Sequence, residues 1–72
     1  MTMGQRLQEE RQTSKLTLEA ISETLDISYQ AYRKFEKDLC YPSVETLIKI
    51  AKMYNLSTDY ILGLTDDKRK YW

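Results

Sequence analysis

The stretch Ser28–Leu39, SYQAYRKFEKDL, constrains this chain most, because its side chains divide into two faces with opposite chemical needs. At about 100° of rotation per residue, a helix through it places apolar and polar side chains on opposite arcs. The apolar arc holds Ala31, Tyr32, Phe35 and Leu39, and the polar arc holds Tyr29, Gln30, Arg33, Lys34 and Lys37. Hydrogen-bonding groups mixed with cations suit base edges flanked by phosphates. A solvated amphipathic helix would show the same pattern.

Size and composition exclude several classes of protein. The chain has 72 residues, enough for one domain with a small core and too few for a large catalytic cleft. It has no His, one Cys and no Gly-rich phosphate loop, so we expect no enzyme, metal site, cofactor or small-molecule ligand. No apolar run approaches the roughly 18 residues of a membrane span, and the signal-peptide pattern is absent, which predicts a cytoplasmic protein without a membrane partner.

Hydrophobic periodicity and capping residues predict four further helices. They cover Met3–Thr13, Leu18–Leu25, Val44–Tyr54 and Thr58–Leu62. Hydroxyl residues stand at the N-cap of the last four of the five helices, namely Thr17, Ser28, Ser43 and Ser57. Pro42 bars continuation of the third helix, and Gly63 can end the fifth through a left-handed backbone. The second and third helices are separated only by Asp26–Ser28, which indicates a helix-turn-helix.

The predicted helix Val44–Tyr54 has the strongest amphipathic pattern in the chain. Its apolar positions recur at helical spacing, as Val44, Leu47, Ile48, Ala51 and Tyr54. We therefore expect this helix to form the centre of the hydrophobic core.

The C-terminal end of the chain changes character after Leu64. Residues 65–72, TDDKRKYW, carry opposed charge clusters without periodicity, so we expect a folded domain over residues 1–64 followed by a mobile tail. The short fifth helix has more apolar area than five residues can hide on a small domain, and a second copy could cover part of it. The candidate dimer contacts are Tyr60, Ile61 and Leu64, with packing into the chain's own core as an equal alternative.

Several segments, in order and spacing, resemble the phage Cro and C1 repressor family, also called the xenobiotic-response-element type. The matching pieces are LTLEAISETLDIS (16–28), FEKD (35–38), YPSVETLIKIAKMYNLS (41–57) and DYILGL (59–64). The resemblance implies an all-α, compact five-helix lambda-repressor-like bundle. It also implies that residues 28–37 are the recognition helix, which enters the major groove of DNA.

The resemblance assigns roles to individual residues. It implies base contacts by Tyr29, Gln30, Arg33 and Lys34, and phosphate contacts by Thr17, Ser28, Lys37 and Tyr41. Gln30 is the first candidate for specificity, because Gln can bind adenine N6 and N7 in bidentate fashion. Arg11 and Glu36 match a structural ion pair that joins the first helix to the third.

The chain departs from the family pattern at four places. Asp26 and Asp38 stand where the family often has Gly, and Asp tolerates a left-handed backbone less well than Gly. Tyr32 replaces a β-branched aliphatic anchor, so its hydroxyl needs a partner or an exit to solvent. Leu18 replaces a frequent Gln, which removes one expected phosphate contact. Ser22 replaces a small Ala.

These observations predict a sequence-specific transcriptional regulator, a repressor that binds a short operator as a homodimer through the major groove of double-stranded DNA. The chain has 11 basic and 11 acidic residues and a formal charge of zero, so its cations must be gathered locally to bind DNA. The same balance favours the alternative, a helix-turn-helix module that binds a protein, as an antitoxin-like or repressor-modulating subunit. A positive stripe interrupted by Glu36 and Asp38 would favour that alternative.

Overall fold

The structure, a computed structural model, describes residues 1–69, and these contain five α-helices and no β-strand. The helices are α1 (Met3–Thr13), α2 (Leu18–Leu25), α3 (Tyr29–Glu36), α4 (Val44–Tyr54) and α5 (Thr58–Leu62). The predicted all-α, five-helix class is confirmed, although α3 ends at Glu36 and not at Leu39. Among the described helices, none has the length and apolar character needed to cross a membrane.

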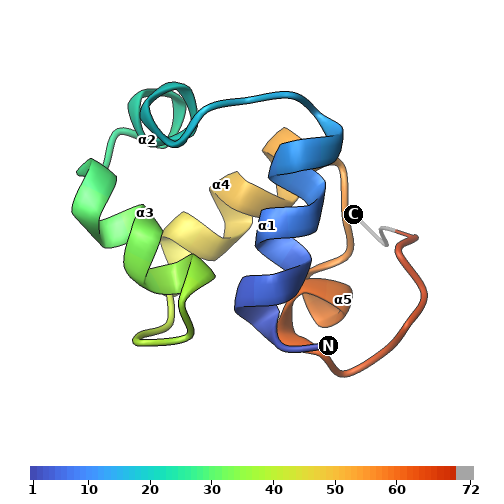
Figure 1. Ribbon diagram of the computed structural model, residues 1–72. Helices are drawn as coiled ribbons and strands as arrows, with labels where there is room; N and C mark the ends of the chain where they lie inside the picture. The colour runs from blue at the N-terminus through green and yellow to red at the C-terminus, as the bar shows by residue number, and fades with distance from the viewer. Residues whose placement is uncertain (70–72) are drawn as a thin grey trace.

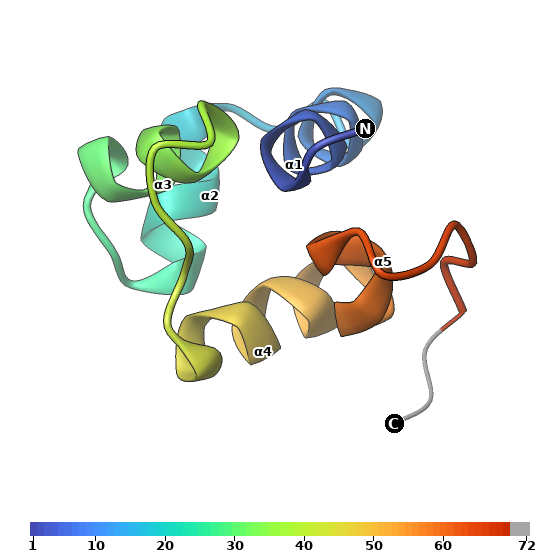
Figure 2. The ribbon, with the colours of Figure 1, turned by 90° about the horizontal axis from the view of Figure 1, so that it is seen from below.

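The helices enclose one core, with the helix-turn-helix on one side of it. α1 packs against both α3 and α5, while α4 packs against α2 and α5 (Figure 1). Seen from below, α3 and α5 lie at opposite ends of the molecule, with α4 running between them (Figure 2). The recognition helix of the predicted motif therefore has one face on the body and one face free of other helices.

Each helix begins at a hydroxyl side chain and is followed by a left-handed residue. The N-caps are Thr2, Thr17, Ser28, Ser43 and Ser57, and each side-chain oxygen accepts a hydrogen bond from an amide of the first turn. The left-handed residues are Lys15, Asp26, Asp38, Asn55 and Gly63. Only one of them is glycine, so the other four helix ends carry the steric cost of a Cβ in this conformation. The left-handed backbone expected at Asp26 and Asp38 is confirmed.

The core takes side chains from all five helices and from the turn before α5. Its buried apolar residues are Met3, Leu7, Ile21, Leu25, Tyr32, Phe35, Ile50, Ala51, Leu56, Tyr60 and Ile61. Burial of a Leu, Ile or Phe side chain stabilises a fold by roughly 1.5–3 kcal/mol, so these contacts hold helices too short to be stable alone.

The apolar stripe predicted for α4 is partly wrong. Val44 and Ile48 are 75% and 45% exposed, whereas Ile50, which the predicted stripe omits, is fully buried beside Ala51. The helix is thus rotated about its axis relative to the prediction, because the packing partners of α4 are α2 and α5. α4 forms one wall of the core and leaves two large aliphatic side chains on the surface.

Of the three residues predicted at a dimer contact, two are buried in the core and one is exposed. Tyr60 and Ile61 are 6% and 0% exposed, so these two assignments are corrected: both side chains fill the core of their own molecule. The guanidinium of Arg6 lies 4.2 Å from the centre of the Tyr60 ring and covers it. Leu64 is 75% exposed and stays a candidate for a contact with a second copy.

The segment that follows α5 contacts α1. A guanidinium nitrogen of Arg6 donates to the carbonyl of Thr65 at 2.7 Å, and another pairs with Asp66 at 2.8 Å. Lys68 pairs with Glu10 at 2.8 Å. The mobile tail over residues 65–72 stays a prediction, and these contacts weigh against it for residues 65–69. The two aromatic residues that end the tail lie outside the described residues.

The left-handed backbone at Lys15 generates a stability prediction. Lys15 has φ 59°, and Lys15→Gly removes the clash of its Cβ, so we expect the free energy of unfolding to rise by about 1 kcal/mol. In a domain of this size, thermal denaturation should show an increase in Tm of roughly 4–8 °C. Ser14→Gly is the matched control, because Ser14 has φ −78° and gains nothing from glycine. Equal effects of the two substitutions would contradict the prediction.

Candidate nucleic-acid interface

The outward face of α3 presents the side chains predicted to read bases. Tyr29, Gln30, Arg33 and Lys34 are all exposed, while Tyr32 and Phe35 on the opposite face are buried. The division of the stretch into two faces is confirmed within α3. Leu39 is the exception, since it lies beyond the helix and is 70% exposed. A hydrogen-bonding amide between two cations on an exposed helix surface can contact base edges and neighbouring phosphates together.

Tyr32 holds α3 against the body. Its side chain is fully buried and packs edge-to-face against Phe35, with ring centroids 6.1 Å apart. Its hydroxyl lies 3.0 Å from the hydroxyl of Tyr54 on α4, so the partner that the sequence required is present. Burial, followed by this hydrogen bond, raises the pKa of Tyr32, and burial raises the pKa of Tyr54 to about 12. Both phenols therefore remain neutral, and the polar end of the anchor is satisfied.

Arg11 and Glu36 form the ion pair predicted between α1 and α3. The Nε atom of Arg11 lies 2.7 Å from Oε2 of Glu36, and a terminal nitrogen lies 3.2 Å from Oε1. The two side chains are 15% and 8% exposed. The hydrogen bond to Glu36 raises the pKa of Arg11 against the opposing effect of burial. The paired planar groups fix both the distance and the orientation between the two helices.

The two carboxylates near the end of α3 do not interrupt the basic face. Glu36 is neutralised by Arg11. Asp38 accepts hydrogen bonds from the amide of Gly4 at 2.9 Å and from the hydroxyl of Thr2 at 2.6 Å, both at the start of α1. The acidic groups are thus turned to partners on α1. The cations left on the outer face of α3 and its end are Arg33, Lys34 and Lys37.

The candidate phosphate contacts lie at helix ends and in the loop after α3. Thr17 and Ser28 are exposed N-caps of α2 and α3, where first-turn amides and the helix dipole favour an anion. Lys37 is exposed at the end of α3, and Tyr41 is 77% exposed in the loop that follows. Leu18, which takes the place of a polar residue, is half-buried against the core. The structure thus places all four candidates on the surface.

A polar hollow lies where α1, α2 and α3 meet, with a volume of about 200 Å³. Its lining residues are Gln8, Arg11, Leu18, Arg33, Glu36 and Lys37. Arg33 of α3 and Lys37, which follows it, therefore line the same hollow as the Arg11–Glu36 pair. Gln8 was missed in the sequence, because a Gln on an exposed helix carries no signal of its tertiary neighbours.

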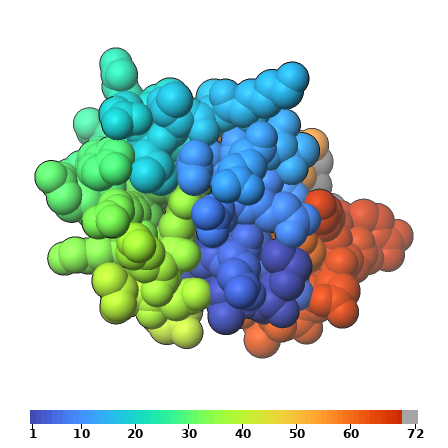
Figure 3. All heavy atoms as spheres, viewed as in Figure 1, coloured from blue at the N-terminus to red at the C-terminus, as the bar shows by residue number. Residues whose placement is uncertain are grey.

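The outer face of α3 is not covered by residues 65–69. In Figure 1 and in Figure 2, residues 65–69 lie on the opposite side of the molecule from α3. The space-filling view shows the green segment that contains α3 at one edge of the molecule, with side chains projecting outward, and the red residues up to 69 at the other edge (Figure 3). Within the described residues, the predicted reading surface is open.

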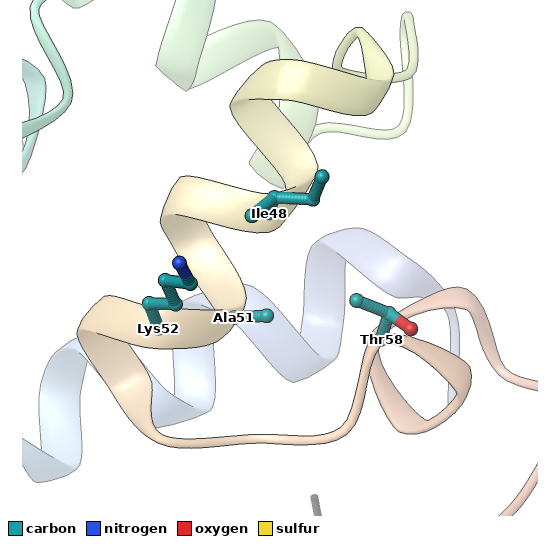
Figure 4. A pocket seen from close by; sticks show the side chains of 4 residues that line it. All are labelled: Ile48, Ala51, Lys52 and Thr58. Atoms are coloured by element: carbon teal, nitrogen blue, oxygen red, sulfur yellow. The ribbon is translucent and has the colours of Figure 1, made fainter. Parts of the chain in front are cut away.

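A second surface feature is apolar and was not predicted. Ile48, Ala51 and Lys52 of α4 and Thr58 of α5 line a groove with a volume of about 210 Å³ (Figure 4). Leu62, one turn after Thr58, is 41% exposed. The sequence pattern placed Ile48 in the core, so the groove could be found only from the packing of α4 against α5.

The sequence matches a known family and known regulators. The helix-turn-helix family model matches residues 7–61. YobD and ImmR, both described as HTH-type transcriptional regulators of Bacillus subtilis, are 41% and 37% identical to this chain over 63 and 70 residues. These matches cover 88% and 97% of this chain and 56% and 55% of those proteins. The chain therefore spans a little over half the length of these relatives.

The fold matches solved structures of repressor domains. The P22 c2 repressor, in complex with a synthetic operator, superposes with a TM-score of 0.83 at 27% identity, over 86% of this chain and 94% of that one. The N-terminal DNA-binding domain of SinR from Bacillus subtilis gives a TM-score of 0.74 at 22% identity, over 82% and 87%, which shows the fold alone. With a family match over most of the chain and a repressor fold, this chain belongs to the Cro/C1-type helix-turn-helix family.

Proposed function

We propose that this chain is a sequence-specific DNA-binding transcriptional repressor that inserts α3 into the major groove of a short operator. The observation that carries the proposal is the open outer face of α3, where Gln30 lies among exposed cations and both nearby carboxylates are engaged by α1. The likeness to an operator-bound repressor supports it. Such a protein acts in the cytoplasm by occupying a promoter and not by catalysis.

The proposal divides the contacts into two kinds. Side chains of the first turns of α3, namely Tyr29, Gln30, Arg33 and Lys34, read base edges. Groups around them position the helix on the backbone, namely Thr17, Ser28, Lys37 and Tyr41. The balanced total charge first favoured a protein-binding module. However, Glu36 is neutralised by Arg11, and the Asp38 carboxylate is directed to the start of α1, which favours DNA.

We further propose that the operator is bound by a homodimer. Two recognition helices then enter successive major grooves about 34 Å apart on one side of the duplex. The groove between α4 and α5 is the best candidate for the contact, because the exposed aliphatic side chain of Ile48 lines it and two more exposed aliphatic residues, Leu62 and Leu64, end α5 and follow it. These residues take the place of Tyr60 and Ile61, which the core of each molecule uses.

Gln30→Ala tests base reading. Loss of a bidentate amide contact should relax the preference at one base pair per half-site by about 1–3 kcal/mol, without a uniform loss of affinity. Selection from random duplexes with the parent and the variant measures this directly. Gln12→Ala, on the exposed surface of α1, is the control and should leave the selected sequence unchanged. An unchanged preference after Gln30→Ala would remove this residue from the reading face.

Lys37→Ala tests backbone binding. Loss of one phosphate contact should weaken binding to all sequences alike and lower the slope of log K against log salt by about 1. Binding titrations on the selected operator and on a scrambled duplex, at several salt concentrations, give both quantities. Lys49→Ala, on α4, removes the same charge away from α3 and should change neither. A loss confined to the operator would show that Lys37 reads sequence.

Ile48→Glu tests the dimer surface. The substitution removes the apolar side chain of the contact and adds a carboxylate that must lose its water for two copies to meet, even beside Lys52. We therefore expect the variant to be monomeric at concentrations where the parent dimerises. Sedimentation equilibrium, with and without operator, gives the association constants. Gln12→Glu adds the same charge on α1 and should dimerise like the parent. Equal association of all three proteins would place the dimer contact elsewhere.

A further inference from the structure

The end of α3 is joined to the beginning of α1 by one side chain, that of Asp38. Its Oδ1 atom accepts a hydrogen bond from the amide of Gly4 at 2.9 Å, and its Oδ2 atom accepts one from the hydroxyl of Thr2 at 2.6 Å. Thr2 is the N-cap of α1, so Asp38 is a second acceptor at this helix N-terminus, supplied from 34 and 36 residues along the chain. A carboxylate at this position interacts favourably with the free amides and with the helix dipole.

The same junction is closely packed on the backbone side. A Cβ atom added at Gly4 would lie 2.3 Å from the carbonyl oxygen of Glu36, the last residue of α3. Only glycine allows the first turn of α1 to approach the last turn of α3 so closely. The two helices therefore meet at two levels, with Gly4 and Asp38 at one and the Arg11–Glu36 pair at the other.

A comparison with Asp26 separates the backbone conformation of Asp38 from the contacts of its side chain. Both residues follow helices of the helix-turn-helix with a left-handed backbone, at φ 57° and 60°. In each, the next amide donates back to the helix, from Ile27 to Ser22 and from Leu39 to Lys34. Within the described residues, however, the Asp26 carboxylate makes no hydrogen bond or ion pair. Asp38 has the same left-handed backbone at the end of its helix, and its side chain is in addition hydrogen-bonded to the start of α1. We call these two hydrogen bonds the link.

We propose that Asp38 is a positioning residue for DNA binding: by binding the N-terminus of α1, it fixes the end of α3 and the loop after it, and so holds Lys37 and Tyr41 at the backbone. This inference rests on the proposed function. Lys37 immediately precedes Asp38, and Tyr41 follows by three residues, so both project from the segment that the link restrains. Without the link, the residues after Glu36 keep only the local hydrogen bonds back to α3, from the amides of Lys37, Asp38 and Leu39.

The protonation state of Asp38 reports on the link. Hydrogen bonds from Thr2, and then from the Gly4 amide, lower the pKa of Asp38. Since the folded pKa lies below the ordinary value of about 3.9, the link is present above that value and is lost as pH falls through the folded pKa. Thr2 and Gly4, at the start of α1, are the groups that face the carboxylate, and no described cation lies within ion-pair distance of it. The amide resonance of Gly4 should therefore titrate with Asp38.

The test compares Asp38→Gly with Asp26→Gly in the full chain. Both substitutions relieve a left-handed Cβ, but only the first removes the link. On the operator selected by the parent, we expect Asp26→Gly to bind like the parent. Asp38→Gly should bind about tenfold more weakly, with a salt slope lower by about 1, while circular dichroism shows it folded. Asp38→Asn should restore most of the affinity, because its amide can bond to Gly4 and Thr2.

The outcomes separate the inference from the function on which it rests. If the parent selects no operator, the proposed function fails, and the Gly4 resonance still shows whether the link exists. If the parent selects an operator and Asp38→Gly binds it as tightly as Asp26→Gly does, the positioning role alone is overturned. A Gly4 resonance that does not titrate near the pKa of Asp38 would also overturn it. In the Lys37→Ala background, Asp38→Gly should have a smaller effect than alone, since part of its action passes through Lys37.

Discussion

Burial of Tyr32 is the contact on which the arrangement of this domain depends. α3 has only eight residues, too few to be stable as an isolated helix, so its orientation is set by the side chains it buries. Tyr32 is the largest fully buried side chain among the described residues, and it carries a hydroxyl into the interior, where Tyr54 satisfies it. Because the Tyr32 ring is packed in the core and its hydroxyl is bonded to Tyr54, α3 has little freedom to rotate about its axis. The polar arc must then face outward.

Polar contacts with α1 add to the core in fixing the position of α3. Arg11 holds the middle of the α1–α3 junction through Glu36, and Asp38 closes its end. Both links use a carboxylate at the end of α3 or just after it. The groups that bind α3 to α1 are therefore carboxylates that would repel phosphate if they faced DNA. A chain with no net charge can thereby present a locally basic face. This arrangement explains how a neutral domain fits the fold of repressors that bind a polyanion.

The far side of the molecule is organised around Arg6, which sequence inspection overlooked. Its guanidinium covers the Tyr60 ring and donates to the carbonyls of Tyr60 and Thr65. A buried cation is costly unless it is well bonded, and here backbone carbonyls and Asp66 supply the partners. The contact draws the segment after α5 onto α1 and away from α3. The open reading face and the contacts of residues 65–69 with α1 are therefore consequences of separate interactions on opposite sides of one core.

The sequence by itself determined the local features: five helices, the hydroxyl N-caps of the last four, the left-handed turns at Asp26 and Asp38, and the two faces of α3. These follow from interactions within a few residues, which periodicity and capping chemistry record directly. Tertiary structure decided which side of α4 is buried, whether Tyr60 faces the core or a partner, and what Asp38 and Arg6 contact. Such choices depend on groups up to about sixty positions apart in the chain, as with Arg6 and Asp66. No local pattern encodes that neighbourhood, because the helix surface offers several equally apolar faces until its packing partners are in place.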